Sequence, residues 1–186
     1  MNEAQRKKRR VSSETALLVI DAQVNMFAPG STVHHGETIL KTLNSLIARA
    51  RSAGVLVVYV QNNGGKGDPD QLGTSGWQIH PALATQAGDL VLQKSTADAF
   101  HLTPLQKELT RRGIRRLVLA GMQTESSIDA TCRRASSLGY EVLLIGDGHS
   151  TYDADGLPAV DVIASHNASL SEFAKVGGSD ELDFGS

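Results

Sequence analysis

The chain has 186 residues, 40% of them hydrophobic, which is enough to bury the core of one domain without disulfides or structural metals. Its formal net charge of −2, with both signs spread along the chain, gives no general attraction to nucleic acid or to a membrane. One cysteine excludes an intramolecular disulfide, and no apolar run reaches the roughly 18 residues that a bilayer requires. These features favour a cytoplasmic protein that acts on a small molecule.

Both ends of the chain have the composition of tails. Residues 1–14 contain five consecutive basic residues at 6–10 and lack the apolar segment of a signal peptide, so we expect a flexible basic tail without a nucleic-acid role. Residues 177–186 combine glycine with acidic residues and have few apolar groups to offset the entropy of ordering. We therefore predict an acidic tail there, loose or packed on a partner, and a single domain over residues 15–176.

Short apolar runs alternate with segments of helical periodicity between these tails. The five clearest runs and a weaker sixth are residues 16–20, 55–60, 90–92, 117–120, 142–145 and 174–176. Because nearly all positions in them are apolar, both faces of each strand should be buried, as in a parallel sheet between helices. The predicted fold is α/β: a single-domain three-layer α/β/α arrangement with a parallel, Rossmann-like sheet of five to six strands.

The helical segments show apolar residues at three- and four-residue spacing. Two stripes are clear, namely Ile39, Leu43, Leu46, Ile47 and Ala50, followed by Leu102, Leu105 and Leu109. Gly54 and Gly113 come after these stripes and directly before the next strand, where a helix C-cap requires a left-handed residue. Two further helices are predicted at about 124–138, ending at Gly139, and at about 157–173.

A long polar loop, QNNGGKGDPDQLGTSGWQ, covers residues 61–78. It exceeds the usual length of a connection in a compact domain, and such loops are usually functional. In an open parallel sheet, ligands bind beyond the carboxyl ends of the strands, which is where this loop begins. We therefore expect it to form a wall or lid of the site.

Side chains that could act as acids, bases or nucleophiles follow three of the predicted strands. Asp21 ends the first, Lys94 follows the third, and the segment GMQTESS at 121–127 follows the fourth. A carboxylate or an ammonium directly after a buried strand is costly unless it is paired or used. Taken singly, Asp21 could be a cap and Lys94 a solvated loop residue, but their common edge of the sheet predicts a site.

Three motifs occur at these strand ends. Residues 17–23, LLVIDAQ, end in D-x-Q; residues 93–100, QKSTADAF, have the form K-x-x-x-D/S-A/G-F; and residues 121–131, GMQTESSIDAT, have the form G-x-x-T-E/D-x-C-V-x-x-T, with Ser127 at the cysteine position and Ile128 at the valine position. Over residues 15–176 the chain resembles the isochorismatase-like cysteine hydrolase superfamily, which includes nicotinamidases, carbamoylsarcosine amidase and streptothricin hydrolases.

The resemblance implies a catalytic role for each of these positions. Asp21 would be the proton shuttle, and position 127 would carry the nucleophile at the start of a helix. Lys94 would hold the aspartate charged and stabilise the nucleophile. The backbone N–H groups of Gln123 and Ser127 would form the oxyanion hole, and the Met122–Gln123 peptide would be cis. The resemblance also implies a homodimer or homotetramer.

We expect neither metal nor cofactor. Nicotinamidases of this superfamily carry a D-x-H motif and a further histidine after the second strand, whereas residues 61–66 here contain no histidine. No other histidine spacing suggests a metal site, and no phosphate-binding glycine motif occurs.

Ser127 departs from the pattern because a hydroxyl has a far higher pKa than a thiol. We expect little or no turnover. Three explanations are open: an engineered cysteine-to-serine change, a natural serine variant, or a pseudoenzyme that only binds. We favour the first because the surrounding residues otherwise match. Cys132 is not a substitute, since five residues along a helix rotate it by about 140° away from Ser127; we predict a buried structural thiol.

The favoured function is hydrolysis of a C–N bond in a small amide, lactam or ureido substrate through a covalent acyl-enzyme. The alternatives are an isochorismatase-type vinyl-ether hydrolase that uses Asp21 without a cysteine, and a non-catalytic binding protein. Gln23 and Phe27 follow Asp21 and are expected to line the substrate pocket. Trp77 is expected either to stack on the substrate or to plug the surface at a subunit contact.

Overall fold

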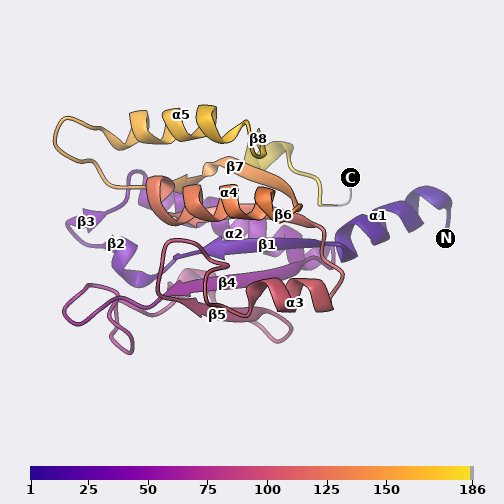
Figure 1. Ribbon diagram of the computed structural model, residues 1–186, viewed down its shortest axis with the longest axis horizontal. Helices are drawn as coiled ribbons and strands as arrows, with labels where there is room; N and C mark the ends of the chain where they lie inside the picture. Colours follow the sequence, from indigo (N-terminus) through magenta and orange to yellow (C-terminus); the bar gives the residue numbers. More distant parts are fainter. Residues whose placement is uncertain (185–186) are drawn as a thin grey trace.

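The computed structural model describes residues 1–184 and confirms the predicted α/β architecture (Figure 1). The central sheet has six strands, all parallel, in the order β5-β4-β1-β6-β7-β8. They are β1 (Thr15–Ile20), β4 (Leu56–Asn62), β5 (Leu90–Lys94), β6 (Arg116–Met122), β7 (Glu141–Ser150) and β8 (Lys175–Gly177). Each of the six apolar runs, the weak one included, therefore lies in a strand. A separate antiparallel ribbon pairs β2 (Phe27–Ala28) with β3 (Ser31–Thr32).

Helices cover both faces of the sheet and make three layers. α2 (Gly36–Ser52) packs on one face through the predicted stripe, all of which is buried. α3 (Leu105–Arg111), α4 (Asp129–Ser137) and α5 (Ala159–Leu170) pack on the other. β1 lies in the middle of the sheet and is buried at every position, because its alternate side chains enter the two cores. Short turns complete the chain: η1 (Val24–Met26), η2 (Pro81–Leu83), the π-helical turn η3 (Thr124–Ile128) and η4 (Ser179–Glu181).

The predicted helix ends are confirmed, with one correction. Gly54 and Gly113 adopt φ of +73° and +68° directly after α2 and α3, as a left-handed cap requires. The prediction that Leu102 belongs to the apolar stripe of the second helix is wrong, because Leu102 is 92% exposed and lies outside α3. Pro104 is the N-cap of that helix, and a proline disfavours helical backbone in the residue before it, so the helix begins only at Leu105.

The N-terminal segment, which the composition predicted to be flexible, forms the helix α1 (Glu3–Ser13). Its first turn is closed by a capping box, in which the Asn2 side chain accepts from the Gln5 N–H and the Gln5 side chain accepts from the Asn2 N–H. Most of the helix is exposed.

The C-terminal segment is packed as far as it is described. The Arg49 guanidinium donates hydrogen bonds to the backbone oxygens of Ser179 and Leu182, and Phe184 is buried at 4% exposure. Residues 185–186 of the predicted acidic tail lie outside the described residues. No helix within residues 1–184 has the length and apolar character needed to cross a bilayer.

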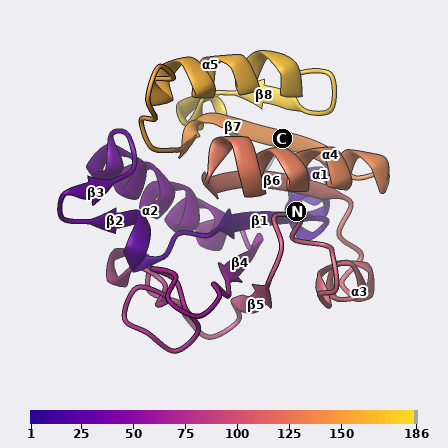
Figure 2. The same ribbon diagram turned by 60° about the vertical axis from the view of Figure 1, so that its left-hand side comes forward.

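The carboxyl ends of the parallel strands share one edge of the sheet. The carboxyl ends of its strands point to the left in Figure 1, where the β2–β3 ribbon and the loop after β4 also lie, whereas both chain ends lie at the right. Figure 2 brings this edge forward. It is the edge at which open parallel sheets bind ligands.

Candidate active site

Three strands deliver the predicted catalytic side chains to this edge. Asp21 follows β1 and adopts φ of +48°, Lys94 is the last residue of β5, and Ser127 lies in η3, the turn after β6. β4 separates β1 from β5, and its last residue, Asn62, is in register with Lys94. Sequence positions as far apart as 21, 94 and 127 thus meet because parallel strands all end at the same edge.

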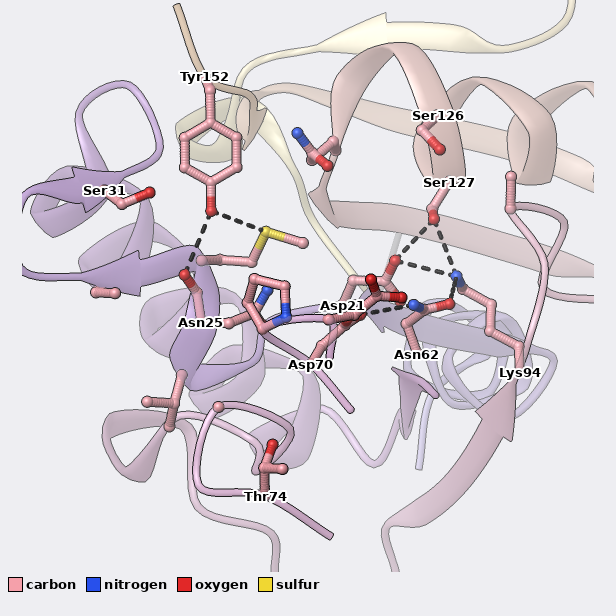
Figure 3. A pocket seen from close by; sticks show the side chains of 18 of the residues that line it. Asp21, Asn25, Ser31, Asn62, Asp70, Thr74, Lys94, Ser126, Ser127 and Tyr152 are labelled. Carbon is pink, nitrogen blue, oxygen red and sulfur yellow. Dashed lines mark hydrogen bonds and ion pairs between the residues drawn. The ribbon is translucent and has the colours of Figure 1, made fainter. Parts of the chain in front are cut away.

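The three side chains contact one another directly (Figure 3). The Ser127 hydroxyl donates to Oδ2 of Asp21 at 2.7 Å, and Nζ of Lys94 donates to the Ser127 oxygen at 3.0 Å. The same ammonium forms an ion pair with Oδ2 of Asp21 at 3.0 Å. Each of the three side chains thus contacts the other two, in an arrangement that we call the closed triangle, and the group at position 127 contacts both a carboxyl and an ammonium.

Burial sets the electrostatics of this cluster. Asp21, Lys94 and Ser127 are 3%, 2% and 4% exposed. Burial raises the pKa of the Asp21 carboxyl, an effect that the Lys94 ammonium and the hydrogen bond from Ser127 offset only in part. Oδ1 of Asp21 is buried and has no hydrogen-bond partner within residues 1–184. Asp21 therefore binds a proton more readily than an exposed carboxyl does, and its Oδ1 is without a partner among the described residues.

The backbone of the turn after β6 is unusual. Gly121 has φ of +126°, and a Cβ there would lie 2.0 Å from the carbonyl oxygen of Ile20, so only glycine fits beside β1. The Met122–Gln123 peptide is cis, which confirms the prediction from the resemblance. The π-helical turn η3 begins directly afterwards, and both Gln123 and Ser127 line the cavity beside it.

The end of β7 holds this turn in place. Nδ1 of His149 lies 2.9 Å from the Thr124 hydroxyl, and Nε2 lies 2.8 Å from Oδ1 of Asn167 on α5. Burial lowers the pKa of His149 and so favours its neutral form. The Thr151 hydroxyl donates to the Glu125 carboxylate at 2.8 Å. Two hydrogen bonds thus tie η3 to the neighbouring strand end.

Sequence analysis missed two residues of the site. Oδ1 of Asn62 accepts from Nζ of Lys94 at 3.0 Å, and its Nδ2 donates to Oδ2 of Asp70 at 2.7 Å. Asn62 thus contacts the Lys94 ammonium on one side and the Asp70 carboxylate on the other. The signal was available for Asn62, since it is a polar residue at the carboxyl end of the strand between β1 and β5.

A cavity of about 900 Å³ opens beside the cluster. Its wall includes Asp21, Lys94 and Ser127, the turn through Ser126, the β2–β3 region, and residues 68–70 and 74–76 of the loop after β4. The prediction that this loop forms a wall of the site is therefore confirmed. The volume suits a small organic molecule.

The three predicted substrate contacts lie outside the lining of this cavity as the described residues define it. The Gln23 amide is 1% exposed and exchanges hydrogen bonds with the backbone of Asn62 and Trp77, so it braces the loop. Phe27 packs against the ring of His80. The Trp77 indole donates to Asn63 and faces a different, shallower pocket.

Cys132 is fully buried in α4, as predicted, and burial raises the pKa of its thiol to about 11. It is therefore a structural residue. In the part of the chain that the structure describes, His, Cys, Asp and Glu side chains form no group of three or more that could hold a metal ion.

The comparisons with known proteins agree with this geometry. The family model for the isochorismatase domain matches residues 15–176. The chain belongs to the isochorismatase family. As a member of this family, it is 35% identical over 161 residues to two streptothricin hydrolases of Streptomyces noursei, a match that covers 86% of this chain but only 64% and 58% of theirs.

Other isochorismatase-family proteins match over similar lengths. The ureidoacrylate amidohydrolase RutB of Klebsiella pneumoniae subsp. pneumoniae is 30% identical over an alignment of 171 residues. The match covers 72% of this chain and 72% of that protein. The crystal structure of an isochorismatase from Pseudomonas putida KT2440 superposes with a TM-score of 0.86 at 26% identity and covers 92% of this chain and 91% of that one. The match to this structure agrees with the α/β fold described above.

Proposed function

We propose that this hydrolase cleaves the C–N bond of a small amide, lactam or ureido substrate through a covalent acyl-enzyme formed at position 127. The observation that carries the proposal is the closed triangle at the cavity wall: the oxygen of residue 127 lies 2.7 Å from the Asp21 carboxyl and 3.0 Å from the Lys94 ammonium. A nucleophile needs a base within hydrogen-bond reach and a cation to stabilise its charged form. The names of the streptothricin hydrolase and ureidoacrylate amidohydrolase relatives support the substrate class.

The steps follow from these contacts for a cysteine at position 127. Asp21 takes the thiol proton, and Lys94 stabilises the thiolate. The sulfur attacks the carbonyl carbon, and the backbone N–H groups of Gln123 and residue 127 stabilise the resulting oxyanion. The C–N bond breaks as Asp21 returns the proton to the leaving nitrogen. Water then hydrolyses the thioester, releases the acid and restores the thiol.

Serine weakens the first of these steps. The Ser127 hydroxyl donates a hydrogen bond to Asp21, so its proton already points toward the proposed base. The pKa of a hydroxyl, however, lies far above that of a thiol, and the Asp21–Lys94 pair is not the histidine relay that activates a serine. We propose that the site is otherwise complete and that serine leaves it able to bind substrate with little or no turnover. This pattern is the one expected of a cysteine-to-serine substitution.

One observation favours a second function. Asp21 lines the cavity, its pKa is raised, and its buried Oδ1 has no hydrogen-bond partner among the described residues. A protonated carboxyl in that position suits direct protonation of a vinyl ether, which is the isochorismatase-type reaction and needs no nucleophile at position 127. Under this alternative, replacing Ser127 by alanine leaves activity largely intact.

The test compares three forms of the protein: the chain as given, Ser127→Cys and Ser127→Ala. Ammonia release is measured on a panel of small amides and ureides, acid release on lactams, and vinyl-ether cleavage on isochorismate. We expect the cysteine form to exceed the serine form by at least about a hundredfold on one C–N substrate and the alanine form to be inactive. Equal activity of serine and alanine forms on the vinyl ether would establish the second function. Silence of all three forms on every substrate would contradict both and support a binding protein.

A further inference from the structure

The charges on the cavity wall are unbalanced. The lining contains three carboxylates, Asp21, Asp68 and Asp70, against one ammonium, that of Lys94. Asp21 and Lys94 form an ion pair with each other. Asp68 and Asp70 come from the loop after β4, and within residues 1–184 no cation lies within ion-pair distance of either. Each of the two carboxylates accepts one hydrogen bond, Asp68 from the Gly65 N–H and Asp70 from the Asn62 side chain, but neither has a cationic partner among the described residues.

Asp70 is fixed in its place. Its Oδ2 accepts from Nδ2 of Asn62, whose Oδ1 in turn accepts from Lys94, so one amide connects the catalytic cluster to this carboxylate. Its backbone oxygen accepts from the N–H of Gly64 at 2.9 Å. Oδ1 of Asp70 has no hydrogen-bond partner among the described residues. Asp70 is thus a half-buried, oriented carboxylate with one oxygen available.

A second and independent observation points to a ligand with N–H groups. Asp21 is 3% exposed and lines the same cavity, and its buried Oδ1 has no partner. Oδ1 of Asn25, another residue of the lining, is also buried without a partner. Buried acceptors are normally satisfied, so these oxygens require donors that the protein does not supply.

Asp70 lies near two other lining residues, Asp21 and Tyr152. Burial is the main cause of the raised pKa of the Asp21 carboxyl and of the Tyr152 hydroxyl, and the negative charge of Asp70 adds to both. Tyr152 and Asp21 are both lining residues, and Figure 3 shows Asp70 between the side of the cavity that carries Asn25 and Tyr152 and the side that carries Lys94 and Ser127. The negative charge of Asp70 would therefore attract a cationic group of a ligand that enters the cavity.

We propose that this cavity selects substrates with a protonated amino group, which Asp70 binds with help from the more exposed Asp68. The amide end of the substrate lies at residue 127, and one of its N–H groups donates to Oδ1 of Asp21. The inference rests on the proposed function for the position of the amide. It adds the substrate class: amides, lactams or ureides that carry a cationic amine away from the scissile bond. Asp70 is then a specificity-determining residue.

Binding is measured by calorimetry on the protein as given, in which Ser127 keeps turnover low. The probes are ω-amino amides with three to five methylene groups, the unsubstituted amides of the same length, and the matching ω-carboxy amides. We expect the amino amides to bind at least about fivefold more tightly than the neutral ones, the carboxy amides to bind most weakly, and added salt to reduce the difference. Asp70→Asn keeps the shape of the side chain and its contact with Asn62, and we expect it to remove most of the preference without weakening the neutral amide.

Asp161→Asn is the control for net charge, because Asp161 is exposed on α5 outside the cavity lining. It should leave all affinities unchanged. Equal binding of amino and neutral amides, an unchanged preference in Asp70→Asn, or no binding of the amino amides up to their solubility would overturn the inference. A preference for the amine without C–N cleavage by Ser127→Cys would contradict the proposed reaction alone. Cleavage of neutral amides without any preference would contradict this inference alone.

Discussion

At the scale of the residue, the ion pair between Asp21 and Lys94 is the most exacting feature of the site. Both side chains are almost completely buried, at 5% and 1% exposure, and Nζ of Lys94 also donates to Asn62 and Ser127. Removing one partner of a buried pair leaves a charge without compensation, whereas removing both is far less costly. The stability of the fold is thus coupled to the chemistry of the site.

We predict that Lys94→Met lowers the free energy of unfolding by about 3–5 kcal/mol, because the Asp21 carboxylate loses its counter-charge. The double variant Asp21→Asn/Lys94→Met should recover at least about half of this loss, since no charge is then left unpaired. Urea unfolding of the parent, both single variants and the double variant measures the coupling. Additive losses in the double variant would mean that the pair is not coupled as described.

The catalytic candidates were predictable from sequence because each follows an apolar run. Predicting that Asp21 and Lys94 lie close together required only the rule that parallel strands end at one edge of the sheet. Asp70 was not predictable, since its position depends on the path of a long loop. The environment of Gln23 also depends on this loop: its side-chain amide is bonded to backbone groups of Asn62 and Trp77, and its role as a substrate contact stays a prediction.

At the scale of the element, η3 depends on the end of β7. His149 connects Thr124 in this turn to Asn167 on α5, and it is 1% exposed. Apolar periodicity predicts where β7 lies, but it does not show that the strand extends through its polar end to Ser150, nor that His149 faces the turn. The register between β6 and β7 shifts between Leu119 and Gly121, which no regular pattern predicts.

His149 gives the fold a pH dependence of known sign. Because burial lowers its pKa in the folded state, the unfolded chain takes up a proton first as the pH falls below about 6.5. The stabilisation is therefore complete above about pH 6.5 and is lost as the pH falls toward and through the folded-state pKa.

We predict that the parent loses more stability than His149→Gln between about pH 7 and pH 5, although the variant starts from a lower value. Comparing the two cancels the contribution of the other five histidines, which both forms share. The measurement is the midpoint of urea unfolding at several pH values. Parallel curves for parent and variant would contradict the role given to His149.

At the scale of the whole molecule, the candidate site lies at the carboxyl ends of the strands, and the two chain termini lie at the opposite side of the sheet (Figure 1). α1 was not predicted as a helix, because its basic residues have no apolar stripe to bury; local capping and helix propensity form it instead. Among the described residues, α1 forms an ion pair with the C-terminal segment between Lys8 and Asp183, which are 64% and 55% exposed. A homodimer or homotetramer remains a prediction from the resemblance.

We predict that deleting residues 1–10 changes the free energy of unfolding by less than about 1 kcal/mol, since exposed ion pairs contribute little. Ligand binding at the opposite edge should be unchanged. Thermal unfolding and calorimetry with a bound amide check both statements. A loss of several kcal/mol, or a change in subunit number by light scattering, would instead make α1 part of an interface.

The central claim is that position 127 carries the covalent intermediate. The most direct measurement is the intact mass of Ser127→Cys, quenched in acid during turnover of a C–N substrate, followed by peptide mapping. We predict an added mass equal to the acyl part of the substrate on residue 127, and none on the protein as given, whose single thiol is the buried Cys132. Turnover with no adduct, or an adduct on Cys132, would contradict it.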